Sequence, residues 1–276
     1  MAIADATREL RVSYAFVERN FNLVKRYWGL EVAWFIYSVS HSLAMGFIGA
    51  GMAQVGGHTG DPSQLVLYLL VGSLVWSYLA VVFDAIGEMI AWERWEGTIE
   101  YTFMAPVSRS THMIGSCLFA VVFGLIRTLL IMLVVVLFFQ LDLSQANLLA
   151  GVTVLALASV SFVGLGITAS TLPLLFPERG GQMVFIFQTC LLLFSGVYYP
   201  IEVMPEWMQA VAQFSPATYA LVGIRASLME GKGIMDQLGT LAPLLVIGAI
   251  TIPVGVRIFS HAERFARRTG RLKRSG

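Results

Sequence analysis

Long apolar segments separated by short polar ones dominate the hydrophobic pattern of this chain. Six of them suggest helices that cross a membrane, since a crossing takes about 20 apolar residues. They lie at about 32–55, 65–90, 111–140, 147–176, 182–199 and 238–259. The fifth is the shortest, because 182–199 makes only about 27 Å of helix at ~1.5 Å per residue, against ~30 Å for a bilayer core. The pattern predicts an all-α integral membrane protein with six transmembrane helices.

The composition excludes an ordinary soluble globule. Hydrophobic residues make up 57% of the chain and charged residues 13%, with a mean hydropathy of +0.75, whereas soluble domains carry about 25% charged residues. The net charge of +1 says little about partners, and we expect no nucleic acid among them. Cys117 and Cys190 both lie in apolar segments, where a thiol is expected rather than a disulfide or metal ligand. No metal site is predicted.

Residues 1–31 predict an amphipathic helix lying in the membrane surface. One helical stripe is apolar and aromatic, while the Lys and Arg side chains lie off it. The stripe consists of Leu10, Tyr14, Val17, Phe21, Val24 and Trp28. A solvated basic arm is the alternative, although Trp and Tyr favour the headgroup region.

Lys and Arg gather on one side of the predicted membrane. Fifteen of the eighteen lie before the first crossing, between crossings two and three, between four and five, or from Arg257 onward. Since cytoplasmic segments carry the excess of Lys and Arg, both termini are expected in the cytoplasm. One transmembrane domain would then cover 1–276, with the cytoplasmic interfacial helix at 1–31, the six spans at 32–259 and a basic tail at 260–276.

A charged interruption at 92–109 separates the second and third crossings. On a helical projection an apolar stripe lies beside an acidic one. The stripes are Trp92, Trp95, Ile99 and Phe103, and Glu93, Glu96 and Glu100. Such a segment can lie against a membrane and offer its carboxylates to another protein, with Gly97 allowing a close approach and Pro106 ending the helix. The alternative is an acidic turn without a partner.

The segment 195–230 is too polar and proline-rich to cross, yet too apolar for a free loop. Pro205 followed by Glu206 suits a helix start, and Pro216 starts a second short helix through about Met229. Irregular backbone survives at membrane depth only under a cover of protein or around a water-filled cavity. We therefore expect a re-entrant extracellular hairpin between spans five and six; the alternative is a loop resting on the surface.

Two separated motifs resemble those of the permease subunits of type-2 ABC exporters. The run ERWEGTIEYTFMAPVSR at 93–109, followed by Gly115, resembles the family pattern E-x-x-x-G-T-L/I-E…P-V/L-S/P-R…G. The segments SGVYYP at 195–200, MPEW at 204–207 and SPATY at 215–219, ending in Arg225, resemble S-G-x-x-F/Y-P…P-x-W…N/S-P-x-T/S-Y/F…R. Both stand in the family order, and the resemblance covers most of the chain.

The resemblance implies a division of labour. Such permeases pair as dimers, here expected to be a homodimer, and two ATP-binding subunits dock on the cytoplasmic coupling helix between spans two and three. ATP and Mg belong to those partners; no G-x-x-x-x-G-K-S/T phosphate loop is found here, so we expect no enzyme activity and no cofactor in this chain. The ATPase-coupling residues implied are Glu93, Arg94, Glu96, Gly97, Thr98, Glu100, Pro106 and Arg109, and those of the hairpin are Tyr199, Pro200, Pro205, Trp207, Pro216, Tyr219 and Arg225.

The resemblance also implies a pathway between spans one, two and five of the two subunits. Candidate lining residues are Tyr37, His41, Trp76, Phe83, Phe187 and Phe194, although each could instead face lipid. Small residues such as Gly46, Gly49 and Gly164 predict close helix packing, and span one is a candidate for the dimer interface.

Ionisable side chains inside a span are costly and need a reason. Asp84 and Glu88 are expected to pair with Arg94 or with N-terminal basic residues rather than to carry protons. Arg127 is expected to have a structural partner rather than a substrate contact. His41 either lines the pathway or packs through a hydrogen bond, and His112 is assigned no role.

The expected function is export of a hydrophobic or amphipathic substrate, drug or lipid, across a bacterial or archaeal cell membrane. Export of a lipid-linked glycan is the alternative, but that branch usually carries R-Y…L-G-x-x-W before span one, and the sequence here reads KRYWG at 25–29 and then LEVAW. An ion-coupled secondary transporter would show internal repeats and midplane charges, and a membrane enzyme would show clustered His, Asp, Glu or Cys. We find no convincing example of either.

Overall fold

The computed structural model describes residues 2–55, 62–104, 109–141 and 143–269, in which all regular structure is helical. The helices are α1 (Ala2–Arg26), α2 (Trp28–Val55), α3 (Pro62–Gly87), α4 (Met89–Glu96), α5 (Ile99–Met104), α6 (Arg109–Phe139), α7 (Leu148–Ala169), α8 (Thr171–Leu175), α9 (Gly180–Leu193), η1 (Ile201–Val203), α10 (Glu206–Ala212), α11 (Pro216–Met229), η2 (Met235–Gln237) and α12 (Leu238–Arg268).

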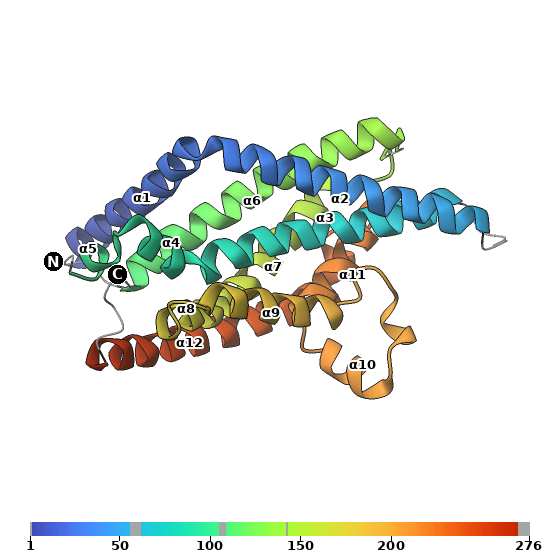
Figure 1. Ribbon diagram of the computed structural model, residues 1–276. Helices are drawn as coiled ribbons and strands as arrows, with labels where there is room; N and C mark the ends of the chain where they lie inside the picture. The colour runs from blue at the N-terminus through green and yellow to red at the C-terminus, as the bar shows by residue number, and fades with distance from the viewer. Residues whose placement is uncertain (1, 56–61, 105–108, 142, 270–276) are drawn as a thin grey trace.

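The predicted all-helical membrane fold is confirmed. Within the described residues, α2, α3, α6, α7 and α12 contain segments long and apolar enough to cross a membrane, and α9 is a shorter apolar helix. These helices run back and forth along the long axis of the bundle, so that the start of α1 and the end of α12 lie at the same end, together with α4, α5 and α8 (Figure 1). We call this the coupling end, and the end that carries α10 the far end.

The predicted fifth span, 182–199, is wrong in its last six residues. Helix α9 ends at Leu193 after 14 residues, which makes about 21 Å. The backbone then turns at Gly196, whose φ of 67° favours glycine because a Cβ is strained there. Ser195, Gly196 and Val197 are buried in protein, the condition under which irregular backbone is tolerated at membrane depth.

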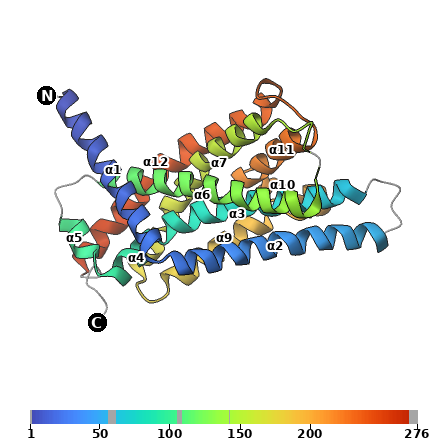
Figure 2. The same ribbon diagram turned by 90° about the horizontal axis from the view of Figure 1, so that it is seen from above.

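Helix α3 forms the centre of the bundle. Figure 2 shows it between α2 on one side and α7 and α12 on the other, and it also packs against α6, α9 and α11. Its side chains Tyr78, Phe83 and Ile86 are fully buried. Burial of apolar surface and close packing hold the helices around α3 together. The elements at the two ends of the bundle are therefore connected through one common core.

Small residues permit the closest helix contacts, as predicted. A Cβ added at Gly164 in α7 would lie 2.6 Å from the backbone nitrogen of Ile252 in α12, and one at Gly49 would lie 2.9 Å from the Cα of Val66 in α3. A Cβ at Gly46 would meet the ring of Phe139 in α6. Gly46 and Gly49 of α2 therefore face helices of the same chain, so a dimer contact through α2 would use its other, exposed face.

Helix α1 packs against α6 and presents its aromatic residues outward. The two helices are in close contact on the bundle side: a Cβ added at Gly115 of α6 would lie 2.8 Å from the Cβ of Phe16 in α1. On the other side Tyr14 and Phe21 are exposed, as is Trp28 at the start of α2, with exposed fractions of 60–68%. The aromatic members of the predicted stripe thus point away from the bundle, as a helix lying in a membrane surface requires, while Val17 and Val24 are half-buried. Contact with lipid stays a prediction.

The two predicted helix starts in the far-end hairpin are confirmed. Pro205 precedes α10 with Glu206 in its first turn, and Pro216 begins α11, which ends at Met229. Helix α11 is buried against α3, α7 and α12, whereas Trp207 of α10 is exposed. Entry of the hairpin into the bilayer stays a prediction.

Arg225 of α11 fixes the turn that follows α9. Its guanidinium donates to the carbonyl oxygens of Gly196 at 3.3 Å and Val197 at 2.8 Å, and lies 3.6 Å from the ring centroid of Tyr68 in α3. A cation over an aromatic face is attracted by the ring quadrupole. This side chain therefore connects α3, α11 and the irregular turn.

Of the predictions for ionisable residues inside the spans, one is confirmed and another is wrong. Arg127 has the predicted structural role: Nη2 donates to Ser38 Oγ at 2.9 Å and Nη1 lies 3.8 Å from Glu31 Oε2, both on α2. The predicted pairing of Asp84 with Arg94 is wrong, because Asp84 accepts a hydrogen bond of 3.5 Å from Gln188 in α9. In the described part of the chain neither Asp84 nor Glu88 forms an ion pair.

Candidate functional site

The charged segment is two short helices at the coupling end, not the single helix that was predicted. Helix α4 ends at Gly97, whose φ of 74° is left-handed and whose amide donates to Arg94 O. A glycine in this conformation is a common helix C-terminus, because other residues carry a Cβ penalty there. The chain then turns into α5, so Trp95 and Ile99 do not share a stripe: Trp95 is exposed and Ile99 is buried.

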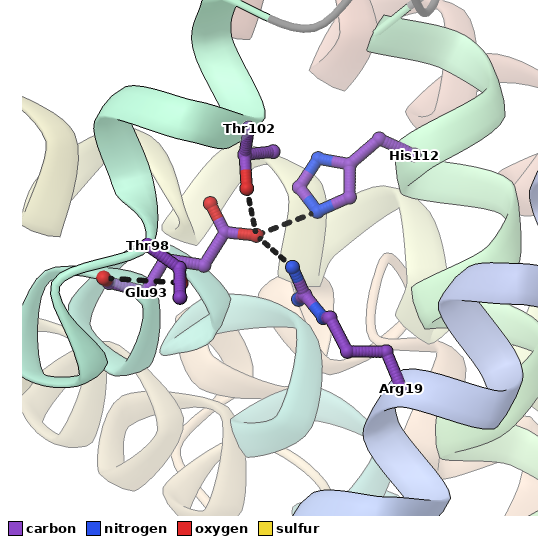
Figure 3. A network of polar contacts seen from close by, with 5 residues as sticks. All are labelled: Arg19, Glu93, Thr98, Thr102 and His112. Carbon is purple, nitrogen blue, oxygen red and sulfur yellow. Dashed lines mark hydrogen bonds and ion pairs between the residues drawn. The ribbon is translucent and has the colours of Figure 1, made fainter.

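Glu93 lies at the centre of a polar cluster formed by α1, α4, α5 and α6 (Figure 3). Its Oε1 is 2.9 Å from Arg19 Nη1, 2.9 Å from His112 Nε2 and 3.4 Å from Thr102 Oγ1. The Thr98 amide donates to the Glu93 carbonyl at 2.9 Å, which fixes the turn beneath. Glu93 is 2% exposed, so the cluster joins the four helices inside the protein rather than at its surface.

The Glu93 carboxylate is held in its charged form. Burial alone would raise its pKa, since the charged form loses hydration. The hydrogen bond and charge of His112, followed by the charge and hydrogen bond of Arg19, outweigh burial and hold the pKa of Glu93 below its ordinary value of 4.5. The Glu93 carboxylate anion therefore lies between the guanidinium of Arg19 in α1 and the ring of His112 in α6.

Arg94 and Glu96 extend the links from α4 to its neighbours. Arg94 is buried and donates from Nη2 to the carbonyl of Leu174 in α8 at 3.1 Å. Glu96 Oε1 accepts a bond of 2.6 Å from Tyr27 Oη, and this bond raises the pKa of the Tyr27 hydroxyl; Arg26 lies 3.7 Å from Oε2. The α4 helix is thus tied both to the α1–α2 junction and to α8.

The outward side of α4 and α5 remains open. It combines aromatic and apolar side chains with one carboxylate that has no ion-pair partner among the described residues, that of Glu100. The exposed residues are Trp92, Trp95, Glu100, Tyr101 and Met104, with Met104 82% exposed. We call these five the outward face. Aromatic residues and Met are enriched where proteins bind each other.

The structure divides the predicted coupling residues into two groups. Glu93 and Arg94 are turned into the chain, which corrects the expectation that their side chains reach a partner, while Glu100 points outward. Gly97 and Thr98 form the turn. Pro106 lies outside the described residues, and Arg109 is known only as the first residue of α6.

The predicted hairpin and pathway residues lie outside the Glu93 cluster and the outward face. Tyr199 donates to the Leu193 carbonyl at 2.6 Å and Tyr219 to that of Gln213 at 2.8 Å, while Pro200 precedes η1. His41 has the hydrogen bond expected of a packing histidine, at 2.9 Å from Tyr198 Oη.

Phe83 does not reach the surface in this conformation, because it is fully buried in the core. A place for it in the pathway stays a prediction that would need the core to open. Phe187 stacks on Phe83 at 5.7 Å between ring centroids and is itself partly exposed. Trp76 is half-buried against the core, Phe194 packs on Trp207 at 6.3 Å, and Tyr37 is exposed on α2.

Sequence reasoning missed three members of the site. Arg19, Tyr27 and His112 contact α4 across long sequence separations. The one available signal was His112 itself, since an ionisable residue at the edge of a span needs a partner.

The comparison with known families matches most of the chain. The sequence pattern of the ABC-2 type transporter family covers residues 12–229, which include the Glu93 cluster, the outward face and the hairpin. The chain belongs to the ABC-2 type transporter family. Its ABC-2 region thus contains each site described above.

Curated relatives of this ABC-2 transporter chain are permeases by name. The linearmycin resistance permease protein LnrN of Bacillus subtilis is 35% identical over 74 residues, 27% of this chain and 19% of that protein. The probable multidrug ABC transporter permease YbhR of Escherichia coli is 23% identical over 190 residues, 69% of this chain and 49% of that protein. The chain spans about half or less of the length of these relatives.

Proposed function

We propose that this chain is the membrane-spanning permease of an ATP-driven exporter, moved by a separate ATP-binding subunit that docks on the outward face. The observation that carries the proposal is the arrangement at α4 and α5. Here an open set of aromatic, Met and acidic side chains is fixed to α1, α6 and α8 by buried polar contacts. A partner that displaces this face displaces the long helices with it.

The proposed assembly has two permeases, as a homodimer, and two ATP-binding subunits, with ATP and Mg bound by the latter. The coupling end would face the cytoplasm of a bacterial or archaeal cell. The excess of Lys and Arg in segments at that end supports this orientation. Exposed apolar residues of α2 and α9, among them Ile36, Phe47 and Phe185, supply surface for the second permease.

The proposed substrate is hydrophobic or amphipathic, a drug or a lipid. The names of two relatives, a multidrug permease and a linearmycin resistance permease, support export of such compounds. The exposed aromatic residues Trp34 and Tyr37 on α2 would suit an apolar cargo at the seam between two subunits.

Docking is tested by reversing the charge of Glu100. The Glu100→Lys variant should recover at least about tenfold less ATP-binding subunit in affinity co-purification, corresponding to a loss of about 1.4 kcal/mol or more. Glu100 is preferable to Glu96, whose reversal would also break the bond from Tyr27. Glu206→Lys, an exposed change on α10 at the far end, is the matched control and should leave recovery unchanged. Equal recovery of the partner with Glu100→Lys would contradict docking on the outward face.

Export is tested on the purified complex in vesicles. ATP hydrolysis should rise at least about twofold, a loss of barrier of about 0.4 kcal/mol, with an amphipathic drug or a lipid that is also transported. Lipid-linked oligosaccharides should have no effect. Stimulation by the oligosaccharide alone would instead indicate glycan export, and transport without the ATP-binding subunit would overturn the proposal.

A further inference from the structure

We propose that a groove between α8 and α12 at the coupling end binds one anionic phospholipid. The site is separate from the outward face and from the far-end hairpin. The proposal does not depend on the proposed export function, because it concerns only the lipid-facing surface of this chain.

The groove is a shallow depression of about 500 Å³. Its lining is Leu175 of α8 together with Arg257, Ile258, His261, Ala262 and Phe265 of α12. The lining surface is almost entirely apolar, although two titratable residues, Arg257 and His261, contribute to it. This combination suits acyl chains below a charged head rather than a soluble anion.

Two stripes of α12 meet along this groove. At about 100° per residue, Arg257, His261, Arg264 and Arg268 fall within about 60° of each other and form a basic stripe. Val254, Ile258, Ala262 and Phe265 form an apolar stripe directly beside it. Because successive members of each stripe are three or four residues apart, they are neighbours on the helix surface.

The basic stripe is not neutralised by its own helix. Glu263, the acidic residue of this turn, lies on the opposite side of the helix and binds Arg267, with Oε1 2.7 Å from Nη2. Arg264 uses Nε to donate to the Ser260 carbonyl. Glu178 and Arg179, in the turn after α8, are both exposed and offset each other. Among the residues whose side chains the structure describes, the net charge facing the groove is therefore positive.

The depth of the stripe along α12 corresponds to a headgroup layer. Helix α12 begins at Leu238, and the distance from there to Arg257 is about 28 Å at ~1.5 Å per residue. This is close to the ~30 Å thickness of the hydrocarbon core. A lipid with its chains on the apolar stripe would thus place its phosphate beside Arg257 and its exposed neighbours.

An anionic lipid fits this surface better than a zwitterionic one. Arginine donates to phosphate in a bidentate manner, and basic pockets at the cytoplasmic side of membrane helices bind anionic headgroups. A zwitterionic headgroup would bring its own ammonium next to Arg257, His261 and Arg264. The geometry thus favours a lipid with net negative charge.

Titration of the purified full chain with lipids tests the proposal. Native mass spectrometry in a neutral detergent should show tighter binding of phosphatidylglycerol than of phosphatidylcholine with the same chains. The double variant Arg257→Gln/Arg264→Gln should bind phosphatidylglycerol about fivefold more weakly for each arginine removed, with phosphatidylcholine unchanged. Arg257→Lys/Arg264→Lys should keep the preference for the anionic lipid.

The matched control removes two exposed cations from α1, as Arg11→Gln/Lys25→Gln. It should leave the affinity for phosphatidylglycerol within about twofold, or 0.4 kcal/mol. Equal binding of both lipids, an equal loss in the control, or competition by free glycerol phosphate as strong as that by the lipid would each overturn the proposal. If the double variant does not elute as a folded protein, Arg264→Gln alone gives the same comparison with a fivefold effect.

Discussion

The Glu93→Gln variant is expected to lower the stability of the protein by about 3 kcal/mol, measured as a fall in melting temperature in detergent. Removing one member of a buried ion pair typically costs 3–5 kcal/mol, because the remaining charges are left unpaired in the protein. The lower value applies here, since Arg19 is 30% exposed and glutamine still accepts one hydrogen bond. His112, which is 3% exposed, should account for much of the loss.

The control for this variant is Glu100→Gln, an equal change one helix away on the outward face. It should alter stability by less than about 0.5 kcal/mol, as expected for an exposed substitution. Equal melting temperatures for Glu93→Gln and the unchanged protein would show that the cluster does not join α1 and α6 to α4.

The same variant also shows how much of the pH dependence of stability comes from the Glu93 carboxylate. The pKa of Glu93 lies below its ordinary value of 4.5, so the stability linked to this group is fully present above pH 4.5. It is lost as the pH falls through the lowered pKa of the folded state, because the proton must then bind a carboxylate held by cations. As the pH falls below 5, the unchanged protein should therefore lose more stability than the Glu93→Gln variant loses.

The Gly164→Val variant is expected to cost about 3 kcal/mol, the upper part of the range for overpacking. A Cβ at Gly164 would lie 2.6 Å from both the nitrogen of Ile252 and the carbonyl carbon of Thr251. These are backbone atoms of α12, which cannot turn aside as a flexible side chain could. Helices α7 and α12 would have to separate, which would also stretch the 2.6 Å hydrogen bond from Ser161 Oγ to the Leu244 carbonyl.

Gly51→Ala is the matched control for Gly164→Val. A Cβ at Gly51 has no atom within 4 Å, so the change should be neutral or stabilise α2 by up to about 1 kcal/mol through helix propensity. A melting temperature of Gly164→Val equal to that of the unchanged protein would mean that α7 and α12 are not packed as described.

The long helices could be predicted because their cause is local. A run of about 20 apolar residues determines a crossing with little help from other parts of the chain, and Pro205 and Pro216 mark helix starts in the same way. Gly97 shows a local signal that a helical projection overlooks. Glycine directly after a helix commonly ends it in a left-handed conformation, so the break between α4 and α5 was visible in the sequence.

The Glu93 cluster could not be predicted, because its contacts depend on how whole helices pack. Arg19 reaches Glu93 across 74 positions of sequence, and only the packing of α1 on α6 brings them together. Arg127 illustrates the limit: its need for a structural partner follows from burial cost, but Glu31 and Ser38 are identified only once α2 lies beside α6. The burial of Phe83 likewise depends on which side of α3 faces the core.

The Glu93 cluster also determines how the coupling end would respond to force. Three donors, from α1, α5 and α6, meet at the single atom Glu93 Oε1, and hydrogen bonds weaken steeply beyond their usual lengths and angles. A movement of α4 that withdraws this oxygen breaks the three contacts together instead of one after another. Small displacements of α4 therefore carry α1 and α6 along, whereas a larger one breaks the contacts of Glu93 with both helices at once and leaves the bond between Tyr27 and Glu96 as a link to the α1–α2 junction.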